Sequence, residues 1–268
     1  MEQVGLLQEA PHPSQTLLME KRAEASIHIM RKLLPNPPTI HELAEEARIT
    51  PWHFIRMFRY TVGIPPGAYL AALRIECAKK LLLMTPERVT NICFDLGFSS
   101  LGSFTTRFTR LVGVSPTSFR RLVDEFSTKK LENQIERQER WHRFPNGKGI
   151  RGVIKTTVPF SGPIFVGLFP KPIPERFPEA STLLMEPGPF QIPHAAREGY
   201  LMAAGIGSAH DPVSYLIPND SLLVDVLPLG HDSDRDRLEI HLRPPKPLDP
   251  PILVALLACL GRPDPNFG

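Results

Sequence analysis

The fold is decided by residues 89–116, which read VTNICFDLGFSSLGSFTTRFTRLVGVSP. Apolar residues recur there at intervals of three and four, which predicts two short helices joined by a tight turn. Gly97 suits that turn because glycine adopts positive φ freely. Ser99 or Ser100 is expected to cap the second helix, and Gly113 to end it. The pattern is typical of a helix-turn-helix.

The same pattern occurs once earlier in the chain, where residues 40–66 read IHELAEEARITPWHFIRMFRYTVGIPP. The copies align at an offset of 49 before the turn and 50 after it. The second offset pairs Phe54 with Phe104, Phe58 with Phe108, Gly63 with Gly113 and Pro66 with Pro116. A tandem pair with matching ends is much rarer than a single helical corner, so the repeat predicts two helix-turn-helix motifs.

The first copy carries recognisable helix-start signals. Thr39 followed by Glu42 predicts a capping box. Thr50 is expected to cap the second helix, with Pro51 in its first turn. Along that helix one face is apolar and predicted to be buried (Phe54, Met57 and Phe58), and the other is predicted to be exposed (Trp52, Ile55, Arg56 and Arg59).

Between the two copies, residues 66–84 are free of proline after the first position and predict a helix of 19 residues. At 1.5 Å per residue such a helix is about 28 Å long, close to the ~34 Å of one DNA turn. A strut of this length would place two recognition helices over successive major grooves. Arg74, Lys79 and Lys80 on it would then reach phosphates.

Residues 23–123 resemble the DNA-binding domain of the AraC/XylS family of bacterial transcription regulators. The resemblance is carried by residues 43–59, 63–74 and, above all, 92–120, which include ICFDLGFSSLGSFTTRF and GVSP. It implies about seven helices, monomeric binding to two consecutive major grooves of double-stranded DNA, and contact with RNA polymerase in activators.

The resemblance and the expected helix faces together give the candidate DNA contacts. The residues expected to read bases are Trp52, His53, Ile55, Arg56, Leu101, Gly102, Ser103, Thr105 and Thr106. The residues expected to contact phosphates are Thr50, Arg59, Arg74, Lys79, Ser99, Ser100, Arg107 and Arg110. Arg56 is expected to donate hydrogen bonds to the O6 and N7 atoms of a guanine, and Trp52 to pack against a thymine methyl group.

The second recognition helix departs from the family. The family commonly offers a glutamine near the start of this helix and an arginine two residues before its last phenylalanine. Leu101 and Thr106 stand at those positions here. We therefore expect the second motif to discriminate less between bases, mostly by van der Waals contact. Arg107, one place later, either contacts a phosphate or pairs with an acid such as Asp95.

Charge and proline content divide the chain. Residues 20–125 carry 15 Lys/Arg against 10 Asp/Glu, whereas residues 151–268 carry 10 against 13. A basic first half suggests a polyanionic partner for that half. Twenty of the 30 prolines follow residue 144. We predict a multi-domain α + β chain made of an N-terminal extension (1–19), an all-α double helix-turn-helix domain (20–125), a charged helical linker (126–148) and an all-β antiparallel sandwich (149–268).

Seven segments of the second half predict strands by period-two alternation: 150–157, 164–169, 181–185, 190–193, 199–204, 221–227 and 238–243. Their spacing favours a sandwich. Residues 188–204 resemble transthyretin-like or carboxypeptidase-regulatory-like β-sandwiches. We expect this region to bind a small-molecule effector or to form a homodimer. The alternatives are a docking module for a partner protein and a hydrolase fused to the DNA-binding domain.

The sequence offers no recognisable catalytic, cofactor or metal site, so we expect a regulator and no enzyme. His194, His210, His231 and His241 lack ligand spacing. Residues 232–236 resemble a calcium loop, but Arg237 replaces its glycine and Arg243 its glutamate, so a polar turn is the better interpretation. Cys77, Cys93 and Cys259 fit a reducing compartment. With no signal peptide or apolar run of ~18 residues, we expect a cytoplasmic protein without a membrane partner.

Overall fold

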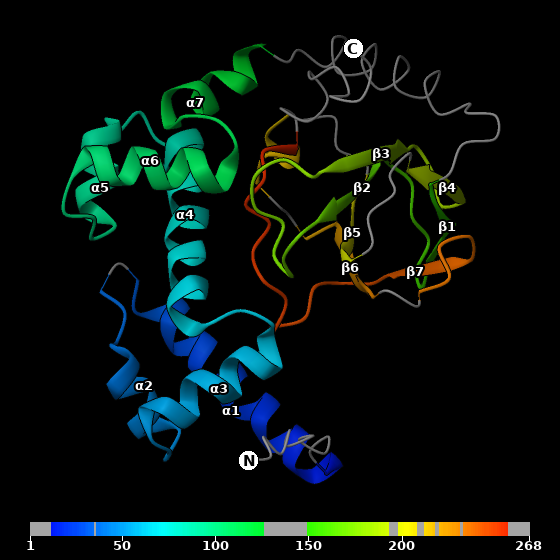
Figure 1. The fold of residues 1–268 in the computed structure, drawn as a ribbon. Coiled ribbons are helices and arrows are strands. Elements are labelled where there is room, and N and C mark those ends of the chain that lie inside the picture. The colour runs from blue at the N-terminus through cyan, green and yellow to red at the C-terminus, as the bar shows by residue number, and fades with distance from the viewer. Residues whose placement is uncertain are drawn as a thin grey trace, which may run out of the picture. The chain divides into compact units, whose positions relative to one another are not determined.

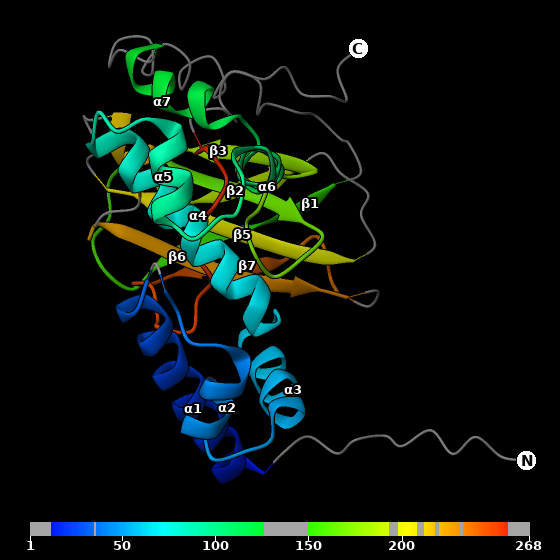
Figure 2. The same ribbon diagram turned by 90° about the vertical axis from the view of Figure 1, so that its left-hand side faces the viewer.

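A computed structural model describes residues 12–34, 36–125, 149–192, 198–207, 212–217, 220–230 and 233–256. Within these residues, seven α-helices precede seven β-strands. Figures 1 and 2 show the helices in blue to green and the strands that follow in green to orange. The expected number of helices and all seven expected strands are confirmed. The expected linker helix at 126–148 lies outside the described residues.

The helices are α1 (Pro13–Lys32), α2 (Ile40–Glu46), α3 (Pro51–Val62), α4 (Pro66–Met84), α5 (Val89–Asp95), α6 (Leu101–Val112) and α7 (Pro116–Glu125). Helix α1 begins seven residues before the domain boundary that the sequence predicts at residue 20. The chain divides into two compact units after Leu70, within α4. The first unit contains α1 to α3, and the second contains α5 to α7 and the strands.

The predicted capping signals operate as expected. The Thr39 N–H donates to Glu42 Oε2 at 2.7 Å, and the Glu42 N–H donates to Thr39 Oγ1 at 3.3 Å. The Thr39 N–H, and after it the Thr39 hydroxyl that donates to the same oxygen at 2.9 Å, hold the pKa of the Glu42 carboxyl below its ordinary value. Thr50 accepts from the His53 N–H, and Ser100 accepts from the Ser103 N–H, so α3 and α6 begin in the same way.

Each recognition helix lies on an aromatic stack that repeats in the two copies. Phe54 contacts Phe58, whose ring meets Tyr69 of α4 edge-on at 5.6 Å between centroids. At an offset of 50 in the sequence, Phe104 contacts Phe108, whose ring meets Phe119 of α7 edge-on at 5.6 Å. All six rings are 0% exposed. The repeat therefore extends beyond the prolines, to Tyr69 and Phe119, which the sequence analysis did not pair.

Helix α7 is joined to the end of α4 through Arg120. Its Nε donates to the Leu82 carbonyl at 2.8 Å and its Nη2 to the Glu87 carbonyl at 2.6 Å. Carbonyls in the last turn of a helix lack an intrahelical partner, so Arg120 satisfies one that α4 leaves open. This contact positions α7 for the packing of Phe119 against α6.

The strands are β1 (Ile150–Thr156), β2 (Ile164–Phe169), β3 (Ala180–Leu184), β4 (Pro189–Ile192), β5 (Gly199–Ile206), β6 (Leu222–Leu229) and β7 (Leu238–Leu242), with a 3₁₀ helix η1 (Pro212–Tyr215) between β5 and β6. They form a sheet in the order β4-β1-β7 and another in the order β3-β2-β5-β6. All pairs are antiparallel except β1 and β7, which are parallel. The expectation of a wholly antiparallel arrangement is wrong for that pair, because period-two alternation is the same in both kinds of sheet.

Both sheets contribute to one hydrophobic core. Ile150 and Ile154 of β1 and Ile240 of β7 come from the first sheet, and Val166 and Leu168 of β2 come from the second. An antiparallel bridge between Val224 and Arg243 connects the edges of the two sheets. These contacts make the β-strands one packed region, which we call the β-region (residues 149–256).

The tight turns of the two motifs use the same backbone conformation with different residues. Arg48 has φ 55° in the first turn, and Gly97 has φ 74° at the corresponding place in the second. A left-handed conformation costs a residue with a Cβ about 1–2 kcal/mol. The first motif therefore carries strain that the second avoids.

We predict opposite effects on stability from exchanging these residues. Gly97→Ala should lower the free energy of unfolding by about 1–2 kcal/mol, because alanine disfavours the left-handed region. Arg48→Gly should raise it by about 0.5 kcal/mol, the relief of strain less the added chain entropy of glycine. Urea denaturation followed by circular dichroism measures both, and a loss of stability in Arg48→Gly would contradict the argument.

Candidate nucleic-acid interface

Helix α3 presents an amphipathic surface whose exposed side carries aromatic and cationic groups. Phe54, Met57 and Phe58 are buried at helical spacing. On the opposite side Trp52 is 63% exposed and Ile55 is 40% exposed, and His53, Arg56 and Arg59 are exposed too. Exposed apolar side chains that lie together on one face, as Trp52 and Ile55 do, are typical of interaction surfaces. The arrangement therefore suits a surface that docks against another molecule.

The exposed face of α3 is internally ordered. The Arg56 guanidinium carbon lies 4.5 Å from the centre of the Trp52 ring, one turn along the helix. A cation over an aromatic face at an exposed site is worth about 0.5–1 kcal/mol. The contact favours a conformation in which the guanidinium and the indole lie together on one face.

Helix α6 exposes a different kind of surface. Leu101 is 39% exposed, Gly102, Ser103 and Thr106 are exposed, and Thr105 is partly buried. The Ser103 hydroxyl donates to the Ser100 carbonyl at 2.9 Å, so part of its hydrogen-bonding capacity is used within the helix. The exposed groups of this face are small hydroxyls and one aliphatic chain.

The residues expected at phosphates have unequal environments. Thr50, Ser99 and Ser100 are exposed where α3 and α6 begin, which is where backbone N–H groups favour an anion. Arg59, Arg107 and Arg110 are also exposed. Arg74 is half-buried on α4, and its Nε is buried with no hydrogen-bond partner.

Burial, and then the nearby charge of Arg107, lower the pKa of Arg74. Two guanidinium groups that repel each other gain from an anion between them. Among the residues that the structure describes, no ion pair joins Arg107 to Asp95, the alternative that the sequence left open. The phosphate interpretation of Arg74 and Arg107 therefore stays a proposal.

Lys79 does not lie where a phosphate could reach it. Its side chain is 2% exposed, and Nζ donates to the carbonyls of Ile252 at 2.9 Å and Leu253 at 3.3 Å. Nζ also lies 5.7 Å from the centre of the Phe119 ring. The sequence places Lys79 on a helix and next to another lysine, but says nothing of a distant segment that covers it. In this structure its role is internal.

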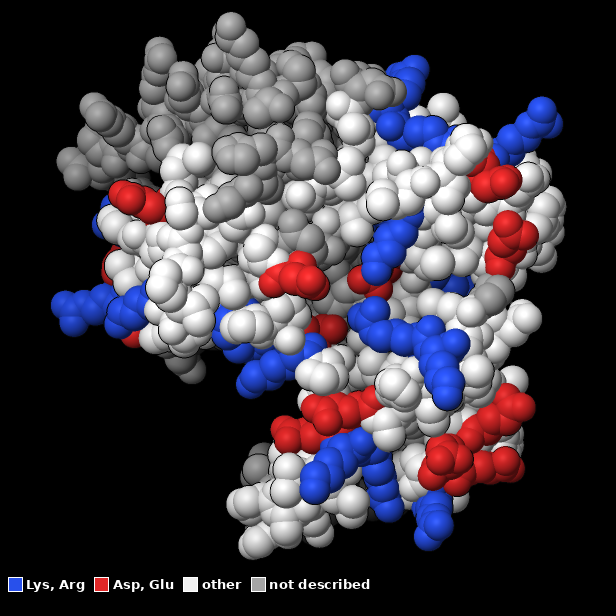
Figure 3. Space-filling view, turned by 180° about the vertical axis from the view of Figure 1, so that it is seen from behind, with Lys and Arg blue, Asp and Glu red and all other residues white. Residues whose placement is uncertain are grey.

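Basic side chains do not form one continuous patch on the face seen in Figure 3, where Lys and Arg are interspersed with Asp and Glu. On that face no basic patch marks a nucleic-acid site, so we define the candidate interface by the residues that α3 and α6 expose. Sequence reasoning also missed two exposed aromatics of the motifs, Tyr60 (60%) and Phe94 (55%). Their helical phase, opposite the buried stripe, was the available signal.

The β-region contains the polar turn that the sequence favoured over a calcium loop. The Asp236 N–H donates to Asp234 Oδ1 at 3.1 Å, just before β7. Within the described ranges, no group of three His, Cys, Asp or Glu side chains is placed to hold a metal ion. His241 lies 3.3 Å from Glu239 on the same strand. Cys77 and Cys93 are free thiols.

Comparison with known proteins identifies the helical motifs. A family model described as a helix-turn-helix domain matches residues 43–122. Residues 43–122 form a helix-turn-helix domain of the AraC type. The chain is 34% identical over 112 residues to YobQ of Bacillus subtilis (strain 168), an uncharacterized HTH-type transcriptional regulator, covering 42% of this chain and 46% of YobQ. It is 37% identical over 87 residues to the HTH-type transcriptional activator AarP of Providencia stuartii, covering 32% of this chain and 64% of AarP.

Among solved structures, the C-terminal domain of AraT, a response regulator from Geobacillus stearothermophilus, is 30% identical, with a TM-score of 0.34, over 38% of this chain and 84% of that one. The chain spans 46% of the length of YobQ and 64% of that of AarP. No helix in the described part of the chain combines the length and the apolar character needed to cross a membrane.

The burial of Lys79 predicts a pH dependence of stability. Burial lowers the pKa of its amine from 10.5 to about 7, with the neighbouring charges of Glu76 and Lys80 acting in opposite directions. Between these values the unfolded chain binds a proton that the folded chain does not, so the contribution of Lys79 to the free energy of unfolding rises with pH. Below about pH 7 both states are protonated and the cost of burying the charge is at its fullest.

We therefore expect the free energy of unfolding of the wild type, less that of Lys79→Met, to increase by a few kcal/mol from about pH 7 to about pH 10. Lys80→Met, at an exposed neighbour, is the matched control and should show no such change. Denaturant titrations at several pH values measure the difference. If the free energy of unfolding changed with pH in the same way in the wild type and in Lys79→Met, the prediction would be wrong.

Proposed function

We propose that this chain is a sequence-specific transcription regulator that binds double-stranded DNA in the cytoplasm, with α3 and α6 reading two successive major grooves. The observation that carries the proposal is the exposed face of α3, where Trp52, Ile55, Arg56 and Arg59 lie opposite a buried aromatic stripe. An α-helix fits the major groove, and cations with an aromatic group suit its base edges and phosphates.

The length of α4 supports reading of two grooves. Its 19 residues correspond to about 28 Å, which approaches the ~34 Å between successive major grooves on one face of the duplex. The names of the relatives agree with regulation of transcription, and that of AarP with activation. We propose contact with RNA polymerase only as what the family resemblance implies for activators. In this proposal α6 contributes less to base discrimination than α3, since its exposed base-reading positions are mainly Leu101, Ser103 and Thr106. Its exposed arginines, Arg107 and Arg110, are assigned to phosphates.

For the β-region we propose effector binding or self-association. Its sandwich arrangement remains an interpretation, supported by the core that the two sheets share. The alternative is docking of a partner protein, and the three are separable by measuring the oligomeric state and ligand binding of the full chain. Hydrogen bonds of the β-region with Lys79 and with the end of α6 support a regulatory role over a catalytic one.

Selection of bound duplexes from a random pool, with the full chain, tests the proposal. Enrichment of a defined sequence with two contacted segments about one helical turn apart supports it. Enrichment of one segment would limit base reading to a single helix. Recovery of random duplexes alone would overturn sequence-specific binding.

Arg56→Ala should weaken binding to the selected duplex by about 1–3 kcal/mol and binding to random DNA by little, because the loss of a guanine contact matters only at the cognate site. Arg237→Ala, which removes the same charge from an exposed site in the turn before β7, is the control. Fluorescence anisotropy measures both affinities. Equal losses on both duplexes would count against base reading by Arg56.

Arg59→Ala should behave differently, since we assign this arginine to a phosphate. Its affinity should fall by a similar factor on cognate and random duplexes. The slope of log K against log salt concentration should decrease by about 1, the loss of roughly one phosphate contact. Titrations at several salt concentrations provide the slope, and an unchanged slope would remove Arg59 from the phosphate contacts.

A further inference from the structure

Helix α6 ends against two segments of the β-region. The carbonyl of Leu111 accepts the Arg176 N–H at 2.6 Å, and the carbonyl of Val112 accepts the Ala255 N–H at 3.1 Å. The last carbonyls of a helix have no partner within it. The β-region therefore supplies the hydrogen bonds that complete the end of the second recognition helix.

One of these segments, residues 250–256, is here called the strap. Leu253, Val254 and Ala255 within it are at most 1% exposed. The N–H groups of Leu253 and Val254 both donate to the Pro174 carbonyl, at 3.1 and 3.0 Å. Pro174 lies in the β2–β3 connection, which also contains Arg176. The strap thus donates hydrogen bonds both to the β2–β3 connection and to the end of α6.

Lys79 holds the strap from the side of α4. An ammonium group has three N–H donors. Two of its neighbours are the carbonyls of Ile252 and Leu253, at 2.9 and 3.3 Å, and a third is the face of Phe119. A buried amine without acceptors would be costly whether it is neutral or charged, because its N–H groups have lost water. Because the strap provides the acceptors, its position and the burial of Lys79 depend on each other.

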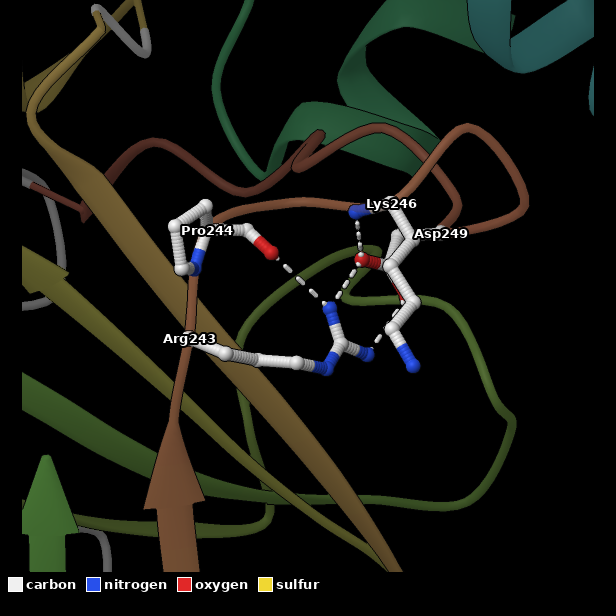
Figure 4. Close-up of polar contacts among 4 residues, drawn as sticks. All are labelled: Arg243, Pro244, Lys246 and Asp249. Atoms are coloured by element: carbon white, nitrogen blue, oxygen red, sulfur yellow. Dashed lines mark hydrogen bonds and ion pairs between the residues drawn. The ribbon is translucent and has the colours of Figure 1, made fainter. Parts of the chain in front are cut away.

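The other end of the strap is tied to the sheets, as Figure 4 shows. Asp249 accepts two hydrogen bonds from Arg243, at 2.7 and 3.0 Å, and a third from the Lys246 N–H at 2.6 Å. Arg243 pairs through its backbone with Val224 of β6, at 2.8 and 3.2 Å. A paired, partly buried ion pair of this bidentate kind is geometrically specific. It sets where the chain leaves β7 to become the strap.

We propose that the strap couples the β-region to the second recognition helix, with Lys79 as its anchor and the Arg243–Asp249 pair as its tether. A change in the β-region that shifts the ends of β6 and β7 is passed through Asp249 to the strap, and from the strap to the end of α6. The coupling is a property of the fold, and only its consequence for DNA depends on the proposed function.

Amide hydrogen exchange of the full chain tests the coupling. Asp249→Asn breaks the tether without touching a helix, and should make the amides of residues 253–255 exchange about tenfold faster or more. Glu239→Gln is the matched control, since it weakens an exposed pair between Glu239 of β7 and Lys155 of the neighbouring β1 (2.7 Å) and leaves the strap intact. Unchanged exchange at 253–255 in Asp249→Asn would overturn the proposal.

A second pair of variants tests the anchor. Lys79→Glu places a carboxylate against two carbonyls and should release the strap, with at least the same acceleration at 253–255. Lys80→Glu makes the same charge change at an exposed neighbour and should not. If Lys79→Glu fails to fold, Lys79→Met, which removes the donors to Ile252 and Leu253 without adding a charge, replaces it in the test. Equal exchange in the two lysine variants, both folded, would remove Lys79 as the anchor.

Affinity for the selected duplex tests the step to DNA. Asp249→Asn should change it by about threefold or more relative to Glu239→Gln. Faster exchange with unchanged affinity would overturn transmission to DNA binding. A wild type that binds no duplex would overturn the proposed function and leave the exchange result standing, so the two failures are distinguishable.

Discussion

The structure depends on the packing of three aromatic rings behind each recognition helix. Two rings on the helix stack one turn apart, and a third, Tyr69 or Phe119, meets the second edge-on from the next helix. Once one face of each helix is buried against these rings, the helical period fixes which residues lie on the opposite, exposed face. Residues 52, 55, 56 and 59 must face outward, and so must residues 102, 103 and 106.

The two motifs share this scaffold but present different chemistry. At the positions expected to read bases, α3 offers an indole and a guanidinium group, whereas α6 offers small hydroxyls and Leu101. The two helices also differ in the hydrogen bonds at their C-terminal ends. The last carbonyls of α6 accept hydrogen bonds from the β-region. The helix with fewer base-reading groups is therefore the one that is hydrogen-bonded to the β-region. Base discrimination and regulation would then be divided between the two helices.

The helix-turn-helix motifs and the strands could be predicted because their signals are local. Caps, turn glycines and apolar spacing lie within a few residues of the structure that they direct, so Thr39 with Glu42 was found, and so was the polar turn at Asp234. The parallel pairing of β1 with β7 was missed because side chains alternate in both kinds of sheet. Tyr69 and Phe119 were missed as a pair because they are not identical. They also lie beyond Pro66 and Pro116, where the alignment of the two copies ended.

By itself, the sequence determined the paired motifs, the exposed faces of α3 and α6, and the positions of seven strands, since each follows from the period of apolar residues along a short segment. Only the tertiary structure determined that Lys79 is buried. Its charge indicated the surface, but segments more than 170 residues apart in the chain meet there and surround it with carbonyls. Long-range contacts of this kind leave no periodic trace, because they depend on how finished elements pack and not on how each one forms.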